Sequence, residues 1–246
     1  MNISPKSNAD GKKNYQPKIA ILISGDGSNL QSMIDSMPVA NFNISLVVSN
    51  KANAYGIQRA KKASIKTAII ENKNFATRAE FDQAIDDVLA QNSIEFIILA
   101  GFMRILTKEF TNKWRGKIIN IHPSLLPCFK GADAVLDALN QGVKFSGCTV
   151  HHVTPEVDSG AIILQSVVRI YPTDTKASLQ TRIKKAEHIC LPLASYCVLN
   201  NITNNITGGN LTKHDKSIIH HIMPENLQDE YGNEILINYK YPADFP

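Results

Sequence analysis

Short apolar runs alternate along this chain with longer stretches in which apolar residues recur every three or four positions. Apolar runs bounded by turn residues are typical of buried strands, and the longer spacing is typical of amphipathic helices. The runs predict strands over residues 19–24, 44–49, 67–70, 96–100, 118–122, 147–153 and 162–170. The periodic stretches predict helices over residues 28–37, 52–63, 77–91, 132–141 and 175–199. This alternation predicts an α/β fold with a doubly wound, mostly parallel sheet.

The two ends of the chain differ in composition from the middle. Residues 1–16 are polar, and we expect them to form a disordered tail. The stretch NNITNNITGGNL is rich in Asn and Gly, which predicts a boundary between a main domain, 17–200, and a C-terminal appendage, 201–246. The appendage has the pattern of a small β-hairpin near residues 234–239. Pro192 should end or kink the last helix, because proline lacks an N–H group.

Composition restricts the possible partners and compartment. The 246 residues carry a net charge of +4, and 43% of them are hydrophobic, which is enough for a substantial core. The lysine pairs are scattered and have no aromatic residues between them, so we expect no nucleic-acid partner. The four cysteines form no CxxC pair, and no apolar stretch is long enough to span a bilayer. We therefore expect a cytoplasmic protein that does not bind membranes.

The stretch SGDGSNL follows the first predicted strand and precedes a predicted helix. It departs from the dinucleotide fingerprint GxGxxG, because Leu30 stands at the third glycine position. A glycine-rich turn at a helix N-terminus can still bind one phosphate through backbone N–H groups and the side chains of Ser28 and Asn29. Asp26 is then an unfavourable neighbour unless its side chain points away. Ser28 could instead simply cap the helix, and the spacing supports both readings equally.

A second informative stretch is KIINIHPSLL, residues 117–126. Because side chains alternate along a strand, Asn120 and His122 should lie on the same face of the strand predicted there. Two polar side chains on one side of a buried strand need partners or a function. The carboxyl end of a strand in an open α/β sheet is also where ligands bind. Pro123 should end the strand, as expected next to a site loop.

A third stretch, TVHHVTPEVDSGAIILQ, contains two predicted strands joined by a loop. The loop carries Asp158 and Gly160, and it could deliver a carboxylate to the edge of the sheet. His151 and His152 are adjacent in a strand and should point to opposite faces, and no Cys or Glu stands at ligand spacing. We therefore expect no metal site.

Six motifs together resemble the phosphoribosylglycinamide formyltransferases, folate-dependent enzymes of purine synthesis. They occur in the order and spacing of that family and cover about residues 17–200. They are GDGSNL (25–30), SNKANAYG (49–56), LAGFMRIL (99–106), NIHPSLLP (120–127), VDSGAIILQ (157–165) and AEHICLP (186–192). The resemblance implies a Rossmann-like formyltransferase fold and transfer of a formyl group from 10-formyltetrahydrofolate to the amine of glycinamide ribonucleotide, with no metal.

The resemblance also implies which residues do the chemistry. Asn120, His122 and Asp158 would be catalytic. Attack of the substrate amine on the formyl carbon places negative charge on oxygen, which Asn120 and a protonated His122 can stabilise. Asp158 would orient the imidazole, keep it charged and help to move protons.

Binding residues follow from the resemblance in the same way. Gly27, Ser28 and Asn29 would bind the phosphate of the ribonucleotide, while Glu187 would hold its ribose or glycinamide part with Lys184 nearby. Arg78 would meet the glutamate tail of the folate. The folate pocket would be lined by Met103, Arg104, Ile105, Leu106, Asn120, Thr154, Pro155, Glu156, Val157 and Asp158.

Three alternatives remain open. Phe129-Lys130-Gly131 also resembles formyltetrahydrofolate deformylase, a hydrolase with the same catalytic residues, although sixteen residues leave no room for its usual N-terminal regulatory domain. Methionyl-tRNA formyltransferase would need a longer chain with a basic C-terminal domain. A folate- or nucleotide-binding protein without turnover would bind ligands but transfer no formyl group. The sequence allows a monomer or a homodimer.

Overall fold

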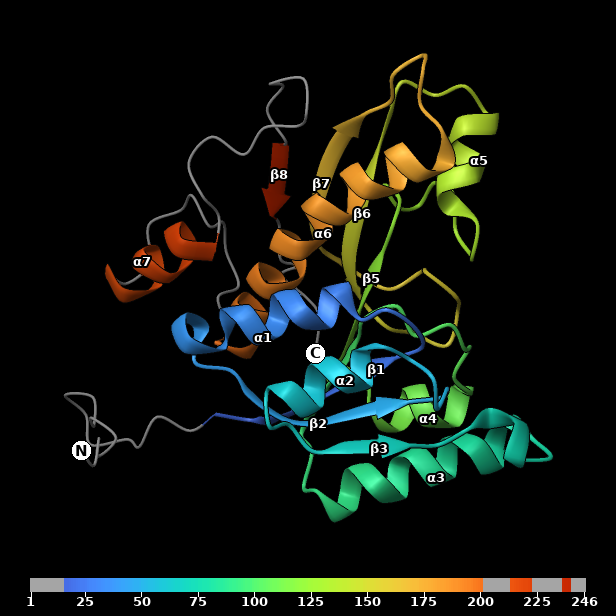
Figure 1. The fold of residues 1–246 in the computed structure, drawn as a ribbon, viewed down its shortest axis with the longest axis vertical. Helices are drawn as coiled ribbons and strands as arrows, with labels where there is room; N and C mark the ends of the chain where they lie inside the picture. Colours follow the sequence, from blue (N-terminus) through green and yellow to red (C-terminus); the bar gives the residue numbers. More distant parts are fainter. Residues whose placement is uncertain (1–15, 201–212, 223–235, 240–246) are drawn as a thin grey trace.

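The computed structural model describes residues 16–200, 213–222 and 236–239 (Figure 1). These residues form an eight-stranded sheet in the order β3-β2-β1-β4-β5-β6-β7-β8. The strands are β1 (Lys18–Ile23), β2 (Asn43–Ser49), β3 (Thr67–Ile69), β4 (Phe96–Leu99), β5 (Ile118–His122), β6 (Phe145–His152), β7 (Ile162–Arg169) and β8 (Leu236–Tyr239). The helices are α1 (Ser28–Ala40), α2 (Gly56–Lys62), α3 (Arg78–Gln91), α4 (Lys108–Lys113), α5 (Ala134–Asn140), α6 (Lys176–Leu199) and α7 (Lys213–Ile222), with a short 3₁₀ helix η1 (Asn72–Asn74).

The pairing of neighbouring strands changes once across the sheet, from parallel to antiparallel. Strands β1 to β5 pair in parallel, whereas the pairs β5–β6, β6–β7 and β7–β8 are antiparallel. The parallel half has the order 3-2-1-4-5, which places a topological switch point between β1 and β4. The prediction of a doubly wound α/β fold is confirmed, with an antiparallel region added beyond β5.

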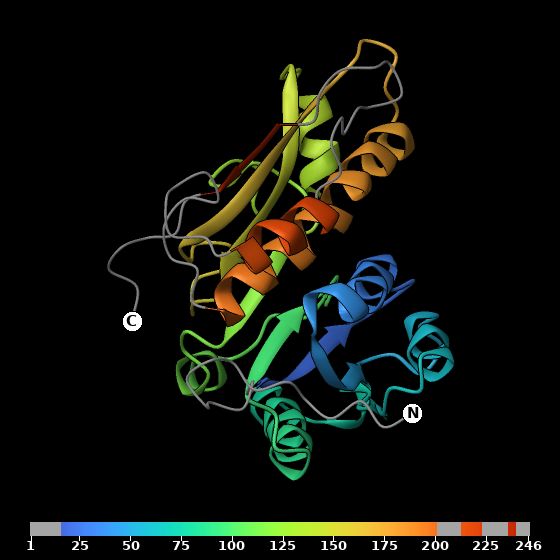
Figure 2. The same cartoon turned by 90° about the vertical axis from the view of Figure 1, so that its left-hand side faces the viewer.

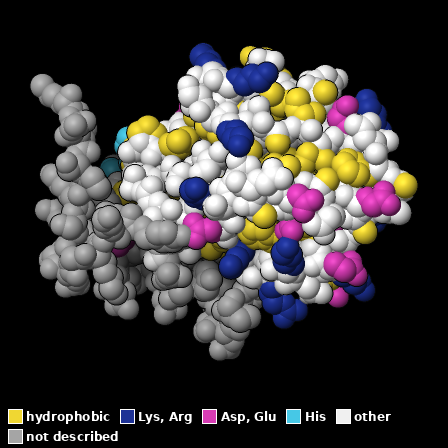
Figure 3. Space-filling view, turned by 90° about the horizontal axis from the view of Figure 1, so that it is seen from below, with side chains coloured by type: hydrophobic (Ala, Val, Ile, Leu, Met, Phe, Trp, Pro, Cys, Tyr) yellow, Lys and Arg dark blue, Asp and Glu magenta, His cyan; other side chains and the backbone are white. Residues whose placement is uncertain are grey.

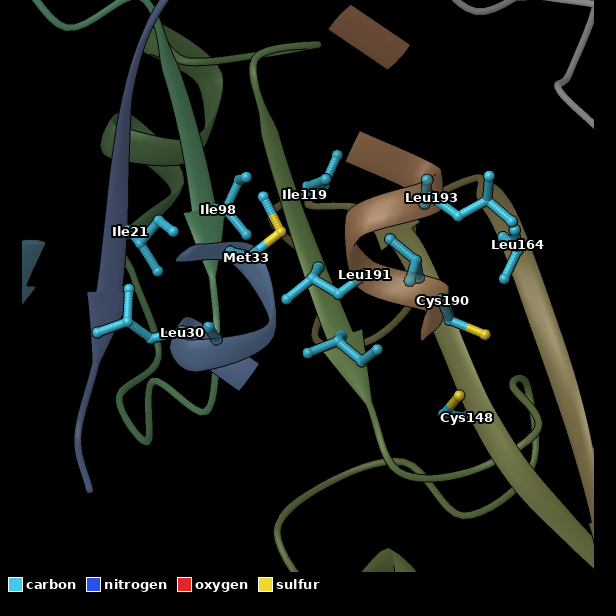
Figure 4. Packing of buried hydrophobic residues seen from close by; sticks show 14 of the residues in the cluster. Ile21, Leu30, Met33, Ile98, Ile119, Cys148, Leu164, Cys190, Leu191 and Leu193 are labelled. Carbon is cyan, nitrogen blue, oxygen red and sulfur yellow. The ribbon is translucent and has the colours of Figure 1, made fainter. Parts of the chain in front are cut away.

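Helices cover both faces of the sheet, as Figures 1 and 2 show. Helices α1, α2, α5, α6 and α7 contribute to one hydrophobic cluster, and α3 and α4 contribute to a second cluster on the opposite face. Figure 4 shows Leu30 and Met33 of α1 beside Ile21 and Ile98, and Leu191 of α6 beside β5. Each central strand is therefore buried on both sides, which explains its almost continuous apolar sequence.

Local structure differs from the sequence predictions at four elements. Helix α2 begins at Gly56 and not at residue 52, because residues 49–54 form a turn in which the Ser49 hydroxyl accepts a hydrogen bond from the Lys51 N–H (3.1 Å). Helix α4 and η1 were not predicted. Helix α6 continues past Pro192, which is buried. Packing of this long helix along the sheet compensates for the backbone hydrogen bond that proline cannot make.

The predicted C-terminal appendage is described only in part. Strand β8 pairs antiparallel with β7 and extends the sheet, so the strand predicted near residues 234–239 is present, while the rest of the predicted hairpin lies outside the described residues. Helix α7 was not predicted, and it buries Ile218, Ile219 and Ile222 in the larger cluster. The predicted N-terminal tail lies almost entirely outside the described residues. Among those described, no helix has the length and apolar character needed to cross a bilayer.

Candidate active site

The glycine-rich turn lies at the topological switch point of the sheet. It follows β1, and Ser24 connects it to the loop after β4. The Ser24 N–H donates to the Gly101 carbonyl (3.1 Å), and the Ser24 hydroxyl accepts a hydrogen bond from the Met103 N–H (2.7 Å). The turn and the loop 101–106 are therefore held side by side at the edge of the sheet where ligands bind in this architecture.

Gly27 is required at its position for two reasons. Its φ is +75°, and a Cβ atom there would lie 2.6 Å from the Gly56 Cα atom. Gly27 is also the N-cap residue of α1, and no side chain caps the helix, so the alternative that Ser28 is merely a helix cap is wrong. Ser28 is the first helical residue, which leaves its side chain free for another role.

Asn29 joins α1 to α6 through a buried contact. Its Nδ2 atom donates a hydrogen bond to Oε2 of Glu187 (2.9 Å). Burial raises the pKa of Glu187 to about 7, although the Asn29 hydrogen bond and the charge of Lys184 both act to lower it. The Oδ1 atom of Asn29 is buried and has no hydrogen-bond partner among the described residues. The residues predicted to bind the ribonucleotide therefore lie on α1 and α6, and Asn29 among them has a hydrogen-bond acceptor without a partner.

Asn120 and His122 lie on the same face of β5, as predicted from the alternation of side chains. Their neighbours Ile119 and Ile121 belong to the larger hydrophobic cluster on the opposite face. Both polar residues line a cavity of about 360 Å³ at the carboxyl end of the parallel strands. Asp158 lines the same cavity, so the structure brings the three predicted catalytic residues together.

The loop between β6 and β7 delivers Asp158 to the cavity. Its Oδ2 atom lies 3.4 Å from His122 Nδ1 and accepts a hydrogen bond from the Gly131 N–H (2.9 Å). Asp158 has a φ of 49°, in the left-handed region. Gly160 lets the loop cross close to β6, since a Cβ atom there would lie 1.7 Å from the His152 carbonyl oxygen. The backbone of this loop thus fixes the carboxylate against the imidazole.

Both ring nitrogens of His122 face hydrogen-bond acceptors. Nδ1 faces the Asp158 carboxylate, and Nε2 lies 2.8 Å from the Phe129 carbonyl oxygen. A carbonyl oxygen can only accept, so Nε2 carries a proton. Only the imidazolium form offers an N–H to both acceptors. The imidazolium form would therefore donate to the Asp158 carboxylate and to the Phe129 carbonyl at the same time.

His151 is a site residue that the sequence argument missed. In the antiparallel pairing of β5 and β6 it lies directly opposite Asn120. Its Nε2 atom lies 3.2 Å from Asn120 Nδ2 and 3.7 Å from Asp158 Oδ1, and its Nδ1 atom lies 2.8 Å from the His152 carbonyl oxygen. Burial lowers the pKa of His151. A neutral ring with its proton on Nδ1 fits these contacts, and it accepts a hydrogen bond from the Asn120 amide.

The cavity contains most of the predicted folate residues. It is lined by all of them except Arg78, which is the first residue of α3. Arg104 covers the ring of Phe81, one helical turn after Arg78, with 5.0 Å between the guanidinium carbon and the ring centroid. Met103 and Ile105 are 67% and 51% exposed, so an apolar wall is open to solvent. The residues predicted to bind the ribonucleotide do not line this cavity. They are Gly27, Ser28, Asn29, Lys184 and Glu187.

The remaining candidate metal ligands and nucleophiles can be located among the described residues. These described residues contain no group of three His, Cys, Asp or Glu side chains that could hold a metal ion. Cys128 is exposed. The Ser124 hydroxyl donates its hydrogen bond to the Cys128 carbonyl (2.6 Å) and not to a basic side chain. On the face shown in Figure 3, Lys and Arg side chains lie in separate places with Asp and Glu side chains between some of them.

Comparison with protein families identifies the chain. A family model described as formyl transferase matches residues 17–195. The chain belongs to the formyl transferase family. A phosphoribosylglycinamide formyltransferase of Haemophilus influenzae is 46% identical over 178 residues, which cover 72% of this formyl transferase and 84% of that protein. The resemblance seen in the sequence motifs is therefore confirmed.

Larger proteins contain a region similar to this formyl transferase. The trifunctional purine biosynthetic protein adenosine-3 of Gallus gallus is 50% identical over 196 residues, which cover 78% of this chain but only 20% of that protein. The chain thus spans a fifth of the length of this relative.

Solved structures agree with the fold. A phosphoribosylglycinamide formyltransferase from Anaplasma phagocytophilum has a TM-score of 0.71 and 40% sequence identity, and the match covers 76% of this formyl transferase and 89% of that chain. A glycinamide ribonucleotide transformylase from Symbiobacterium toebii has a TM-score of 0.76 at 35% identity, covering 81% and 94% of the two chains.

Proposed function

We propose that this chain transfers the formyl group of 10-formyltetrahydrofolate to the amine of glycinamide ribonucleotide. The observation that carries the proposal is the arrangement of Asn120, His122 and Asp158 on one wall of a cavity with an apolar entrance. Relatives with the name phosphoribosylglycinamide formyltransferase support the choice of substrates.

The proposed reaction uses the charges and donors of the site. The substrate amine forms a bond to the formyl carbon, and the carbonyl oxygen becomes negatively charged. The His122 imidazolium and an N–H of Asn120 stabilise this oxygen. The intermediate then collapses with cleavage of the bond to N10 of the folate. Asp158 keeps His122 charged and relays the proton of the attacking amine toward the leaving nitrogen through water.

The ribonucleotide would bind between α1 and α6. Its phosphate would accept hydrogen bonds from the backbone N–H groups at the start of α1 and from Ser28, where the helix dipole also favours an anion. The unused Oδ1 atom of Asn29 can accept a hydrogen bond from the substrate, and the Glu187 carboxyl can bind a hydroxyl or amine. Lys184 lies one helical turn before His188 on α6 and adds positive charge.

The folate would occupy the cavity. Its flat ring suits the apolar wall made by Met103, Ile105, Leu106 and Val157, which line the cavity. Arg78 would bind the glutamate tail outside it. The substrate amine then has to reach the formyl carbon at the carboxyl end of β5, where the two sites meet.

The test is a direct assay with the purified full chain, 10-formyltetrahydrofolate and glycinamide ribonucleotide. We expect the formylated ribonucleotide and tetrahydrofolate to appear in equal amounts, with a His122→Ala variant as the control for background transfer. Release of formate that does not depend on the ribonucleotide would instead indicate a deformylase. Binding of both ligands without product would indicate a binding protein, and either result would refute the proposal.

A further inference from the structure

The turn proposed to hold the phosphate carries a carboxylate of its own, and Arg59 neutralises it. Arg59 Nε donates a hydrogen bond to the Asp26 carbonyl oxygen (2.9 Å), and Nη2 lies 3.2 and 3.3 Å from the two carboxylate oxygens of Asp26. Its Nη1 atom donates to Gln31 on α1 (3.4 Å). The guanidinium carbon lies 4.9 Å from the centroid of the Tyr55 ring. One side chain therefore ties the turn, α1 and α2 together.

A glycine contact places Arg59 beside the turn. The Gly56 N–H donates to the Gly25 carbonyl (3.1 Å), and a Cβ atom on Gly27 would meet Gly56 at 2.6 Å. The same Cβ atom would lie 3.6 Å from Arg59 Cδ. The absence of side chains at both glycines thus lets the first turn of α2 approach closely enough for the guanidinium to reach Asp26.

Arg59 is one of two basic side chains whose positive charge acts on His188 of α6. Burial is the largest cause of the lowered pKa of His188 on α6; the positive charges of Lys184 and Arg59 also lower it, and the negative charges of Asp26 and Asp35 raise it. Two acidic and two basic side chains therefore act electrostatically on the same residue. Without Arg59, this group would carry a net negative charge where a phosphate dianion is proposed to bind.

We infer that Arg59 is a positioning residue of the phosphate subsite: it holds the Asp26 carboxylate and cancels its repulsion of the ribonucleotide. This inference rests on the proposed function. The side chains of Arg59 and Asp26 are 24% and 56% exposed, and ion pairs this exposed contribute little to folding. Arg59 should therefore affect ligand binding much more than it affects stability.

The test is calorimetric titration of glycinamide ribonucleotide into the full chain and into Arg59→Ala, Asp26→Asn and the double variant. We expect Arg59→Ala to weaken binding about tenfold, or about 1.4 kcal/mol. In the Asp26→Asn background the same change should cost about twofold or less, because no carboxylate is left to neutralise. Glycinamide riboside, which lacks the phosphate, should bind equally well to all four proteins.

Lys73→Ala is the matched control, since it removes one positive charge from an exposed ion pair with Glu71 elsewhere in the chain. It should leave ribonucleotide binding unchanged. Thermal unfolding of Arg59→Ala should stay close to that of the original chain, which shows that weakened binding does not arise from misfolding.

Two results would overturn the inference while leaving the proposed function intact. Unchanged ribonucleotide binding by Arg59→Ala would show that the ion pair has no role in the subsite. An equal loss with and without the Asp26→Asn change would show that Arg59 acts in some other way than by neutralising the carboxylate. If the original chain binds the riboside and the ribonucleotide equally, there is no phosphate subsite, and both the ribonucleotide assignment and the inference fail.

Discussion

Replacing Glu187 with Gln should stabilise the protein at neutral and alkaline pH. The Glu187 side chain is buried with only 5% of the residue exposed, and its pKa is raised from 4.5 to about 7. Burial causes this shift by disfavouring the charged form. Glutamine has nearly the same shape and can still accept the hydrogen bond from Asn29 Nδ2, but it never ionises.

The direction of the effect follows from proton linkage. Between pH 4.5 and about 7, the unfolded chain has lost the Glu187 proton while the folded chain keeps it, so stability falls as the pH rises. The contribution of the protonated carboxyl is fully present below pH 4.5 and is lost once the pH exceeds about 7. Raising the pKa from 4.5 to about 7 corresponds to about 3 kcal/mol of folding free energy.

The assay is urea unfolding of the original chain and Glu187→Gln at several pH values across the interval from 4.5 to 8. The stability advantage of the variant should grow with pH and level off at about 3 kcal/mol above pH 7. A Glu109→Gln variant, at an exposed position on α4, controls for charge removal. A difference that is the same at every pH would refute the reasoning. If Glu187 holds the ribonucleotide as proposed, the variant should also bind it more weakly above pH 7, because a glutamine amide is a weaker acceptor than a carboxylate.

Further predictions concern the proposed catalytic and binding residues. Asn120→Ala, His122→Ala and Asp158→Asn should each lower turnover about a hundredfold or more, and combined losses should be much smaller than the product of the single ones; near-normal turnover of His122→Ala would exclude the mechanism. Arg78→Ala should raise the KM for folate and leave kcat nearly unchanged, so a fall in kcat at saturating folate would contradict its role. Ser28→Ala should weaken ribonucleotide binding by about 1 to 3 kcal/mol without lowering the melting temperature, since Gly27 and not Ser28 caps the helix; unchanged ribonucleotide kinetics would remove Ser28 from the phosphate site.

Local periodicity was enough to predict part of the site. Asn120 and His122 share a face because side chains alternate along any strand, and this holds whatever the strand pairs with. His151 could not be placed in the same way, since its position depends on the antiparallel register between β5 and β6. The sequence showed only two adjacent histidines on opposite faces, without indicating which one faces Asn120.

Contacts between distant segments explain the other differences. The glycine-rich turn was recognisable as a possible phosphate site, but the requirement for Gly27 comes from its contact with Gly56. Likewise, Asp26 was an unfavourable neighbour for an anion until the structure placed Arg59 against it, 33 residues later in the chain. Pairing of β8 with β7 is also a long-range contact, so a local pattern suggested a hairpin there.

The hydrogen bond between His122 Nε2 and the Phe129 carbonyl has a consequence for ligand binding. In the resting protein this donor is already satisfied, so the chain does not carry a buried N–H without a partner. On the proposed mechanism, the formyl oxygen replaces the Phe129 carbonyl as the acceptor of the His122 N–H. This hydrogen bond strengthens as the formyl oxygen gains negative charge. A molecule without a hydrogen-bond acceptor near His122 Nε2 cannot replace the Phe129 carbonyl. On the proposed mechanism, a ligand must therefore offer an acceptor at least as strong as the backbone carbonyl before it can take the N–H of His122.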